Sequence, residues 1–148
     1  MTNLSNSAYT GPVYFGSPMQ EGTPMFVYDS GSGWLTTTST SCSNCEGSKY
    51  YSPAASDTYD LVSSETVSLS YGSATLDGLY VKDNVCLSST TCVADFEFFM
   101  IEKEEGLQGL SGILGMSPVD EEKNGPSYVK ALYDAGTISE EKATFWLN

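Results

Sequence analysis

Residues 24–33 read PMFVYDSGSG, and this short stretch decides how the rest of the sequence is interpreted. Its first half, Pro24 to Tyr28, is apolar and is typical of a buried β-strand. Its second half, Asp29 to Gly33, is rich in Gly and Ser, which favour turns. A buried strand thus delivers an acid into a turn whose amides and hydroxyls can hydrogen-bond a carboxylate. Although Asp-Ser-Gly also occurs in ordinary turns, this setting makes Asp29 a candidate for chemistry.

The sequence around this stretch predicts an all-β domain with one or two short helices. Alternating apolar residues at 66–71 and a return at 75–81 predict a β-hairpin with its tip near Gly72 to Ala74. Gly112 to Met116 is expected to be a short buried strand, and Pro126 to Ala135 a helix that Gly136 ends. Further strands are expected at 13–15, 93–101 and 144–147, an acidic bend at 102–105, and an irregular chain at 36–60.

The charge and composition exclude several classes of function. The chain has 148 residues, 19 acids, six Lys, no Arg and no His, and its net charge is −13. Such a surface has no basic patch for nucleic acid and is disfavoured at anionic membranes. Without His, Ser/His/Asp and Cys/His nucleophilic sites and His-based metal sites are excluded. The acids either are simply solvated or indicate work in acid, where their mutual repulsion fades.

Four cysteines form two close pairs, Cys42 with Cys45 and Cys86 with Cys92. An even number in close pairs favours two small disulfide loops and a secretory or vacuolar setting. The alternatives are a redox motif at Cys42 to Cys45, or a four-cysteine zinc site, for which the second pair is spaced too widely. We therefore expect disulfides and no metal.

A carboxylate suits a mechanism that needs neither His, metal nor cofactor. When two carboxylates face each other, they share one proton. One carboxylate then holds and deprotonates a water, while the other donates a proton to the scissile carbonyl of a peptide. Asp29 would supply one of the two.

Five segments, in order, resemble the amino-terminal lobe of pepsin-like aspartic proteases, and the match runs from Tyr9 onward. The resemblance implies one lobe of the barrel of that family and a peptide or protein substrate. The segments are GSPMQ at 16–20, similar to Gly-Thr-Pro-Pro-Gln; FVYDSGS at 26–32, similar to the Asp-Thr-Gly-Ser loop; SLSYGS at 68–73, similar to the flap; GILGM at 112–116, similar to Gly-Ile-Leu-Gly-Leu; and the closing helix and strand at 126–147.

The resemblance implies a role for each residue of the site. Asp29 would be the catalytic acid and base. Ser30, at the place of a Thr that braces two lobes, Gly31 and Ser32 would support it. The flap would cover substrate with the residues Tyr71, Gly72 and Ser73.

The sequence departs from the family pattern in several places. Trp34 comes before the position of the usual Trp, where Thr36 stands. Ser111 replaces an Asp, and Ala74 replaces a flap Gly, which stiffens the tip. No second Asp-[Ser/Thr]-Gly loop is present, so the chain does not encode a full dyad.

These observations leave four readings. The chain is a lobe that needs a second lobe, or a homodimeric protease in which two copies of Asp29 meet. It is otherwise an inactive binding or structural module, or a zinc- or redox-active Cys protein. We expect a flexible segment at 1–8 and a lobe at 9–148. No leader or transmembrane run is visible, and we expect a secreted or lysosomal/vacuolar location.

Overall fold

The structure, a computed structural model, describes residues 2–4, 8–21, 25–45, 50–107, 109–119 and 125–146. For residues 2–4 and Tyr71 it describes the backbone only. The strands in this part of the chain are β1 (Thr2–Leu4), β2 (Ala8–Gly11), β3 (Tyr14–Phe15), β4 (Phe26–Asp29), β5 (Leu35–Ser43), β6 (Asp60–Leu61), β7 (Val67–Tyr71), β8 (Ala74–Ser88), β9 (Thr91–Glu105) and β10 (Gly112–Gly115). The helices are the 3₁₀ turn η1 (Pro53–Ala55) and α1 (Tyr128–Asp134).

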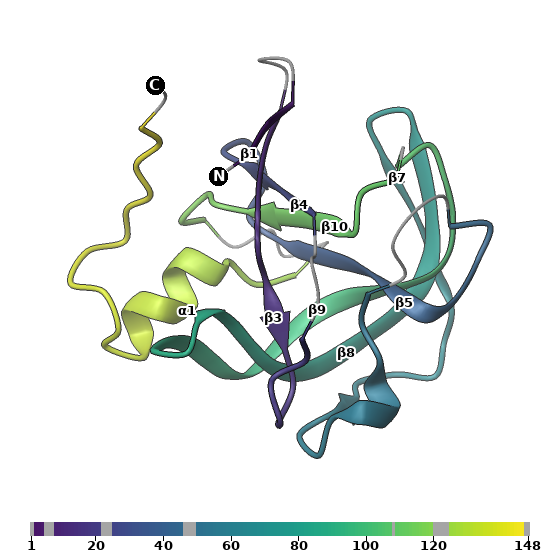
Figure 1. The fold of residues 1–148 in the computed structure, drawn as a ribbon, viewed down its shortest axis with the longest axis horizontal. Coiled ribbons are helices and arrows are strands. Elements are labelled where there is room, and N and C mark those ends of the chain that lie inside the picture. Colours follow the sequence, from purple (N-terminus) through teal and green to yellow (C-terminus); the bar gives the residue numbers. More distant parts are fainter. Residues whose placement is uncertain are drawn as a thin grey trace.

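All these strands belong to one curled sheet with the order β1-β2-β4-β10-β5-β9-β8-β3, to which β6 and β7 add at β8. The long antiparallel pair β8 and β9 crosses the bottom of Figure 1 and rises on the right towards β7. Register shifts along this pair mark bulges. Bulges strengthen the local twist, which explains how two long strands can curve around a core.

Three strands at the middle of the sheet hold the predicted site stretch. β10 pairs in parallel with β4 on one side and antiparallel with β5 on the other. Gly112 fits there because a Cβ would lie 2.0 Å from the Thr36 carbonyl oxygen. Gly115 is equally confined, with its Cβ position 2.5 Å from the Ser32 carbonyl oxygen. Glycine at both ends of β10 therefore lets the chain after β4 pass close behind it.

Two groups of buried side chains form the core. The larger one is aromatic: the ring of Phe15 lies 4.9 Å from that of Phe98 and 5.1 Å from that of Tyr51, centroid to centroid. The smaller one packs Trp34 and Phe99, 6.2 Å apart, with aliphatic residues under the β7–β8 hairpin. Rings at such distances and tilts pack favourably within each group.

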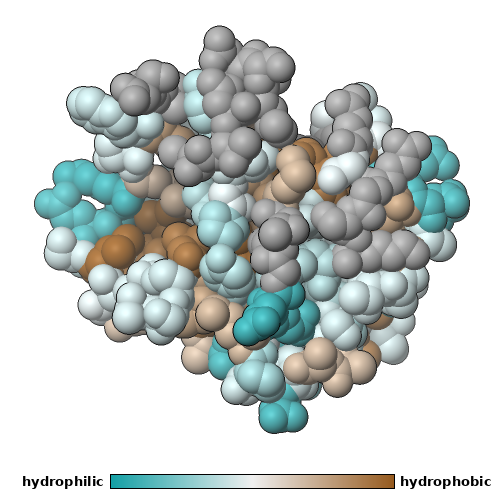
Figure 2. Space-filling view, viewed as in Figure 1, coloured by the Kyte–Doolittle hydropathy of each residue, from teal (hydrophilic) through white to brown (hydrophobic). Residues whose placement is uncertain are grey.

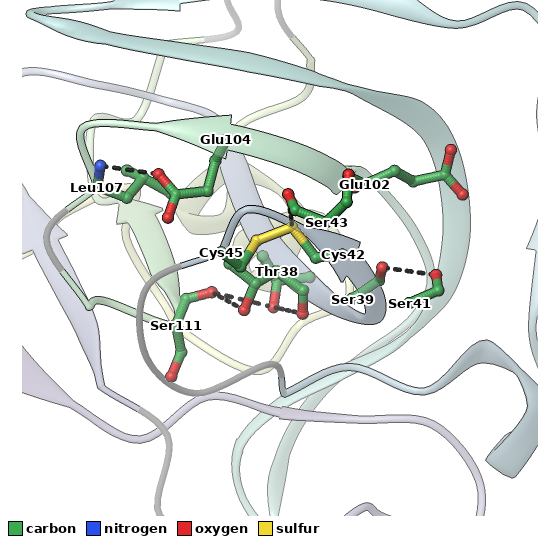
Figure 3. Close-up of a disulfide and its surroundings, with 11 residues drawn as sticks. Thr38, Ser39, Ser41, Cys42, Ser43, Cys45, Glu102, Glu104, Leu107 and Ser111 are labelled. Atoms are coloured by element: carbon green, nitrogen blue, oxygen red, sulfur yellow. Dashed lines mark hydrogen bonds between the residues drawn. A yellow bond between two sulfur atoms is a disulfide. The ribbon is translucent and has the colours of Figure 1, made fainter.

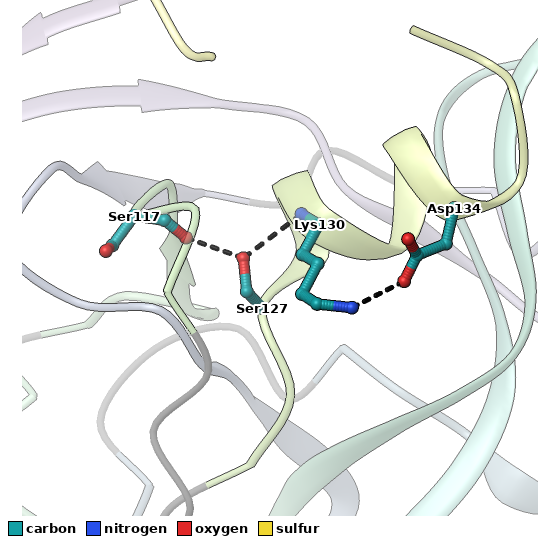
Figure 4. A network of polar contacts seen from close by, with 4 residues as sticks. All are labelled: Ser117, Ser127, Lys130 and Asp134. Atoms are coloured by element: carbon teal, nitrogen blue, oxygen red, sulfur yellow. Dashed lines mark hydrogen bonds and ion pairs between the residues drawn. The ribbon is translucent and has the colours of Figure 1, made fainter. Parts of the chain in front are cut away.

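Helix α1 is tied to the chain that leaves β10 (Figure 4). The Ser127 hydroxyl caps the helix by accepting a hydrogen bond from the Lys130 amide at 3.2 Å, and donates to the Ser117 carbonyl at 2.6 Å. One turn on, Lys130 pairs with Asp134 at 2.6 Å. An N-cap of this kind stabilises a helix by about 1 kcal/mol.

The fold confirms the all-β prediction, the hairpin, the buried strand at 112–115 and the helix. Three expectations were wrong. Residues 36–43 lie in β5 rather than in irregular chain, and residues 102–105 continue β9 instead of bending. Residues 144–146 form no strand, while Leu147 lies outside the described residues, as does Pro24.

The start of the chain also takes part in the sheet. Thr2–Leu4 pairs antiparallel with β2, at the end of the sheet order. The division into a segment at 1–8 and a lobe at 9–148 stays a prediction.

Candidate active site

Asp29 is the last residue of β4 and enters the loop beside β10. Its carbonyl accepts a hydrogen bond from the Met116 amide at 2.8 Å, and the Ser32 carbonyl accepts one from Ser117 at 2.9 Å. The loop is thus held to the segment that leaves β10 at both of its ends. These bonds fix the backbone from which the Asp29 side chain projects.

The Asp29 carboxylate is partly buried. The Gly31 amide donates a hydrogen bond to its Oδ1 at 2.8 Å. Ser30 and Gly31 are exposed, whereas Ser32 is only 5% exposed. The Ser32 hydroxyl has no hydrogen-bond partner among the described residues. The structure therefore brings all four loop residues together, with the carboxylate held by its own turn.

The preceding residue, Tyr28, anchors the strand. Its hydroxyl donates to the Pro12 carbonyl at 2.8 Å. Burial, and to a smaller extent the neighbouring Tyr14, raises the pKa of Tyr28 to about 12. Tyr28 therefore remains neutral in acid and at neutral pH, and it adds no second charge next to Asp29.

The β7–β8 hairpin closes with a two-residue turn. Tyr71 pairs with Ala74, and Gly72 has a φ of 58°. A positive φ at the first central position is what a type II′ turn requires, and Gly adopts it without strain. The side chain of Tyr71 lies outside the described part of the structure, so its predicted role is not addressed by the geometry.

The tip of the hairpin packs against the end of β9. A Cβ at Gly106 would lie 3.2 Å from the Ala74 Cα and 3.3 Å from the Ser73 carbonyl oxygen. Gly106 itself has a φ of 95°, which an L side chain rarely adopts. This close contact holds the tip beside the chain that continues to Leu107.

Asp29 and the hairpin tip line the same pocket, which has a volume of about 280 Å³. Its other walls are mostly aliphatic, because Leu107, Leu110 and Ile113 complete them together with Val27. An apolar pocket with a charged group on its wall is a common arrangement for a binding site. The lining residues are Val27, Asp29, Ser73, Ala74, Gly106, Leu107, Leu110 and Ile113.

Two residues where the sequence departs from the family pattern lie behind this pocket. Trp34 is 4% exposed and packs in the same apolar group as Leu107 and Ile113. Thr36 is 1% exposed, and its hydroxyl has no hydrogen-bond partner in the described part of the chain. The indole of Trp34 thus lies inside the fold, where its bulk supports the pocket.

The structure joins Cys42 to Cys45 and Cys86 to Cys92 by disulfides. Figure 3 shows the first of these beside Thr38 and Ser111, whose carbonyl accepts a bond from the Thr38 hydroxyl at 3.1 Å. Cys42 is fully buried in the apolar group behind the pocket. The second disulfide links paired residues of β8 and β9. Among the described residues, no group of three or more acids, His or Cys is placed to hold a metal.

Two buried acids were missed by the sequence analysis. Glu104 is 2% exposed, and its carboxylate accepts a hydrogen bond from the Leu107 amide at 3.0 Å, which fixes the bend at the pocket wall (Figure 3). Asp83 is fully buried and accepts bonds from Tyr51, Ser56, Thr58 and the Asn84 amide. Neither acid belongs to a motif. The alternation of inward and outward residues along a strand does not predict that a carboxylate is buried.

A family model described as eukaryotic aspartyl protease matches residues 8–148. The chain belongs to this family. Its relatives include pepsin A of Gallus gallus, 31% identical over 121 residues, covering 79% of this chain and 32% of the relative. Phytepsin of Hordeum vulgare is 30% identical over 157 aligned positions, covering 100% of this chain and 30% of the relative. Pepsin A of Bos taurus is 26% identical over 153 aligned positions, covering 100% of this chain and 41% of the relative.

The chain spans about a third of the length of these relatives. Together with the fold, the match establishes a single pepsin-like lobe of the amino-terminal kind. Within the described residues, no helix is both long and apolar enough to cross a membrane.

Proposed function

We propose that this chain is the lobe of an aspartic endopeptidase that contributes one carboxylate, Asp29, to a two-Asp dyad. The observation that carries the proposal is the shared pocket: Asp29 and Ser73 of the hairpin tip line one cavity with aliphatic walls. A peptide lying there would be held between the hairpin and the carboxylate. The second Asp comes from a second lobe or from a second copy of the chain.

The two carboxylates share the catalytic work. One of them, ionised, takes a proton from a bound water as the water attacks the scissile carbonyl. The other, protonated, donates its proton to the carbonyl oxygen, which gives a neutral tetrahedral intermediate. Like charges so close cannot both ionise, which is why the pair holds one proton in acid. The Gly31 amide orients the Asp29 carboxylate by its hydrogen bond.

The neighbouring residues have supporting roles in this proposal. The Ser32 hydroxyl, buried beside the loop, is available to hydrogen-bond Asp29 or a bound water once the partner lobe is in place. Ser30 is exposed, as a brace towards a second lobe must be. The hairpin residues Tyr71, Gly72 and Ser73 cover the peptide, with backbone groups of the turn as contacts.

The two disulfides support a secreted or lysosomal/vacuolar location, because such bonds persist in oxidising compartments. The excess of acids is compatible with work at low pH, where protonation relieves the self-repulsion of a chain with a net charge of −13.

Hydrolysis of a denatured protein in acid tests the proposal, with Asp29→Asn compared to the wild type. Asp95→Asn is the matched control: it also removes one carboxylate, but from an exposed position with a φ of 53°, which Asn tolerates. Where a second copy of the chain supplies the second Asp, we expect the wild type and the control to cleave, and Asp29→Asn to be slower by about 10³-fold or more. Equal cleavage by Asp29→Asn would refute the site.

The alternative is an inactive peptide-binding or structural module, either monomeric or homodimeric. It is favoured by the lack of a second Asp-[Ser/Thr]-Gly loop in the sequence. Absence of cleavage by all three proteins, at concentrations where the chain is associated, combined with binding of an apolar peptide at the pocket, would support this alternative.

A further inference from the structure

Glu104 is a buried acid at a strand position where packing alone favours an apolar residue. Its side chain is 2% exposed, and it pairs across the β8–β9 ladder with Leu76, which belongs to the apolar group behind the pocket. Burying a carboxyl group costs free energy unless hydrogen bonds compensate for the loss of water. Figure 3 shows the carboxylate bent back towards the Leu107 amide, which donates to it at 3.0 Å. The acid therefore supplies an acceptor to the chain that follows it.

This hydrogen bond spans the bend between β9 and the wall of the pocket. Glu105 forms the terminal pair of the β8–β9 ladder on this side, and Gly106 then has a φ of 95°. Gly106 lies against the hairpin tip, where its Cβ position is 3.2 Å from the Ala74 Cα. One residue later, Leu107 lines the pocket that Asp29 also lines. The bond therefore fixes the backbone on both sides of the residue that contacts the hairpin.

The same bend places two parts of the pocket lining relative to each other. Ser73 and Ala74 of the hairpin tip line the pocket, and so do Leu107 and Leu110 beyond the bend. In Figure 2, hydrophobic residues reach the surface between the places that β10 and β7 occupy in Figure 1. Leu107 is only 4% exposed, so a shift of its backbone also moves a packed side chain. The width of the pocket thus depends on the bend at Gly106.

We propose that Glu104 is a positioning residue that sets the width of this pocket, and thereby its affinity for an apolar side chain of the substrate. The inference rests on the proposed function in one respect, namely that a peptide binds in the pocket of Asp29. The property that matters is an acceptor oxygen within reach of the Leu107 amide, and not the negative charge. A carboxyl group keeps acceptor capacity when it is protonated. The contact is therefore kept in acid, where the proposed dyad operates.

Three substitutions at this position separate the acceptor from the charge. Glu104→Gln keeps the length of the side chain and an acceptor oxygen, and removes the charge. Glu104→Asp keeps the charge but is one methylene shorter, so its oxygens lie too far from the amide. Glu104→Met keeps the length and has no oxygen. Glu105→Met is the matched control, because Glu105 is the next residue of the same strand and is exposed.

An NMR titration of each variant with a short apolar peptide measures the dissociation constant. We expect the wild type, Glu104→Gln and Glu105→Met to agree within about twofold, whereas Glu104→Asp and Glu104→Met should bind about tenfold more weakly, as for the loss of one hydrogen bond. Urea unfolding should show Glu104→Met to be at least as stable as the wild type, since an apolar residue replaces a buried carboxyl group. Weaker binding without lower stability distinguishes positioning from general damage to the fold.

Hydrogen exchange at the Leu107 amide gives a readout that needs no peptide. Exchange should be faster in Glu104→Asp and Glu104→Met than in the wild type and Glu104→Gln, and the amide signals of Ser73 and Ala74 should shift in the same two variants. The pair Glu104→Gln and Glu104→Asp decides the question even if Glu104→Met does not fold.

Two results would overturn the proposal: equal weakening of binding by Glu104→Gln and Glu104→Asp, or unchanged exchange and binding in Glu104→Asp. A wild type that binds no peptide, with the exchange pattern as expected, would refute the pocket of the proposed function and retain the role of Glu104 in holding the bend. Peptide binding that is the same in all variants would do the reverse.

Discussion

Two aspartates in this lobe sit in opposite surroundings. Asp83 in β8 is fully buried and receives hydrogen bonds from Tyr51 at 2.8 Å, Ser56 at 2.9 Å and Thr58 at 2.5 Å, besides the Asn84 amide at 2.8 Å. Asp29 is partly buried and lines a pocket with aliphatic walls. A carboxylate surrounded by donors holds structure together, whereas one that faces a cavity is available to a substrate. The comparison separates an acid used for stability from one proposed for chemistry.

The largest expected difference is in the free energy of unfolding. Asp83→Ala leaves the buried Tyr51 hydroxyl and its neighbours without their acceptor, which should cost about 3–5 kcal/mol. Asp29→Ala loses only contacts of a partly exposed loop and should cost about 1 kcal/mol or less. Urea unfolding of both variants measures the difference. Similar losses for the two would mean that Asp29 is structural as well.

A smaller loss of stability is expected when one of the hydrogen-bond donors to Asp83 is removed. Tyr51→Phe keeps the ring in the aromatic core and removes the hydroxyl, so the loss should be about 1–2 kcal/mol, as for a hydrogen bond to a charged group. The double variant with Asp83→Ala should lose less than the sum of the two single losses, because the hydroxyl no longer has its acceptor. Simple additivity would show that the two groups do not interact.

The decrease in stability at alkaline pH should depend on the same contact, the hydrogen bond from Tyr51 to Asp83. Burial, followed by the hydrogen bond to Asp83, raises the pKa of Tyr51 above that of a free tyrosine, about 10. From about pH 10 upward the unfolded chain therefore binds fewer protons than the folded one, and stability falls as pH rises. Denaturation midpoints at pH 8 to 11 should fall less steeply for Tyr51→Phe. An unchanged slope would place the ionising group elsewhere.

The smallest effect on stability should come from a change at Ser32, in the loop that follows Asp29. Ser32→Ala removes a buried hydroxyl without a described partner, so the free energy of unfolding should change by about 0.5 kcal/mol or less, or even rise. If the hydroxyl supports Asp29, hydrolysis in acid should nevertheless slow down. A large loss of stability would instead reveal a hydrogen bond of Ser32 within the lobe.

The sequence predicted the features that depend on local pattern. Spacing of residues is enough to recognise three such features: the apolar run into Asp29, the alternation that ends at Gly72 and the Gly-bracketed strand at 112–115. Asp83 and Glu104 could not be predicted as buried, because their donors come from distant segments, such as the Tyr51 hydroxyl or the Leu107 amide. The strand at 35–43 was missed because its Ser and Thr residues resemble a loop, although most of them are buried between β9 and β10.

The predicted strand at 144–147 is absent over the described residues 144–146 for a different reason. Its residues favour a strand, but a strand exists only where another strand offers hydrogen bonds, and none of the described strands does so. Local preference alone does not supply a pairing partner. The roles of Asp29, Ser30, Gly31 and Ser32, and of the hairpin residues, stay predictions in the same sense, since catalysis needs a second carboxylate.

The most direct test of the account is an NMR titration of the wild-type chain in acid with a short apolar peptide. It follows the Asp29 carboxyl carbon together with the amides of Ser73, Gly106 and Leu107. The account predicts that all four signals shift together along one binding curve, because one pocket holds the carboxylate and the hairpin tip. Shifts at the hairpin with an unmoved Asp29 signal would contradict it.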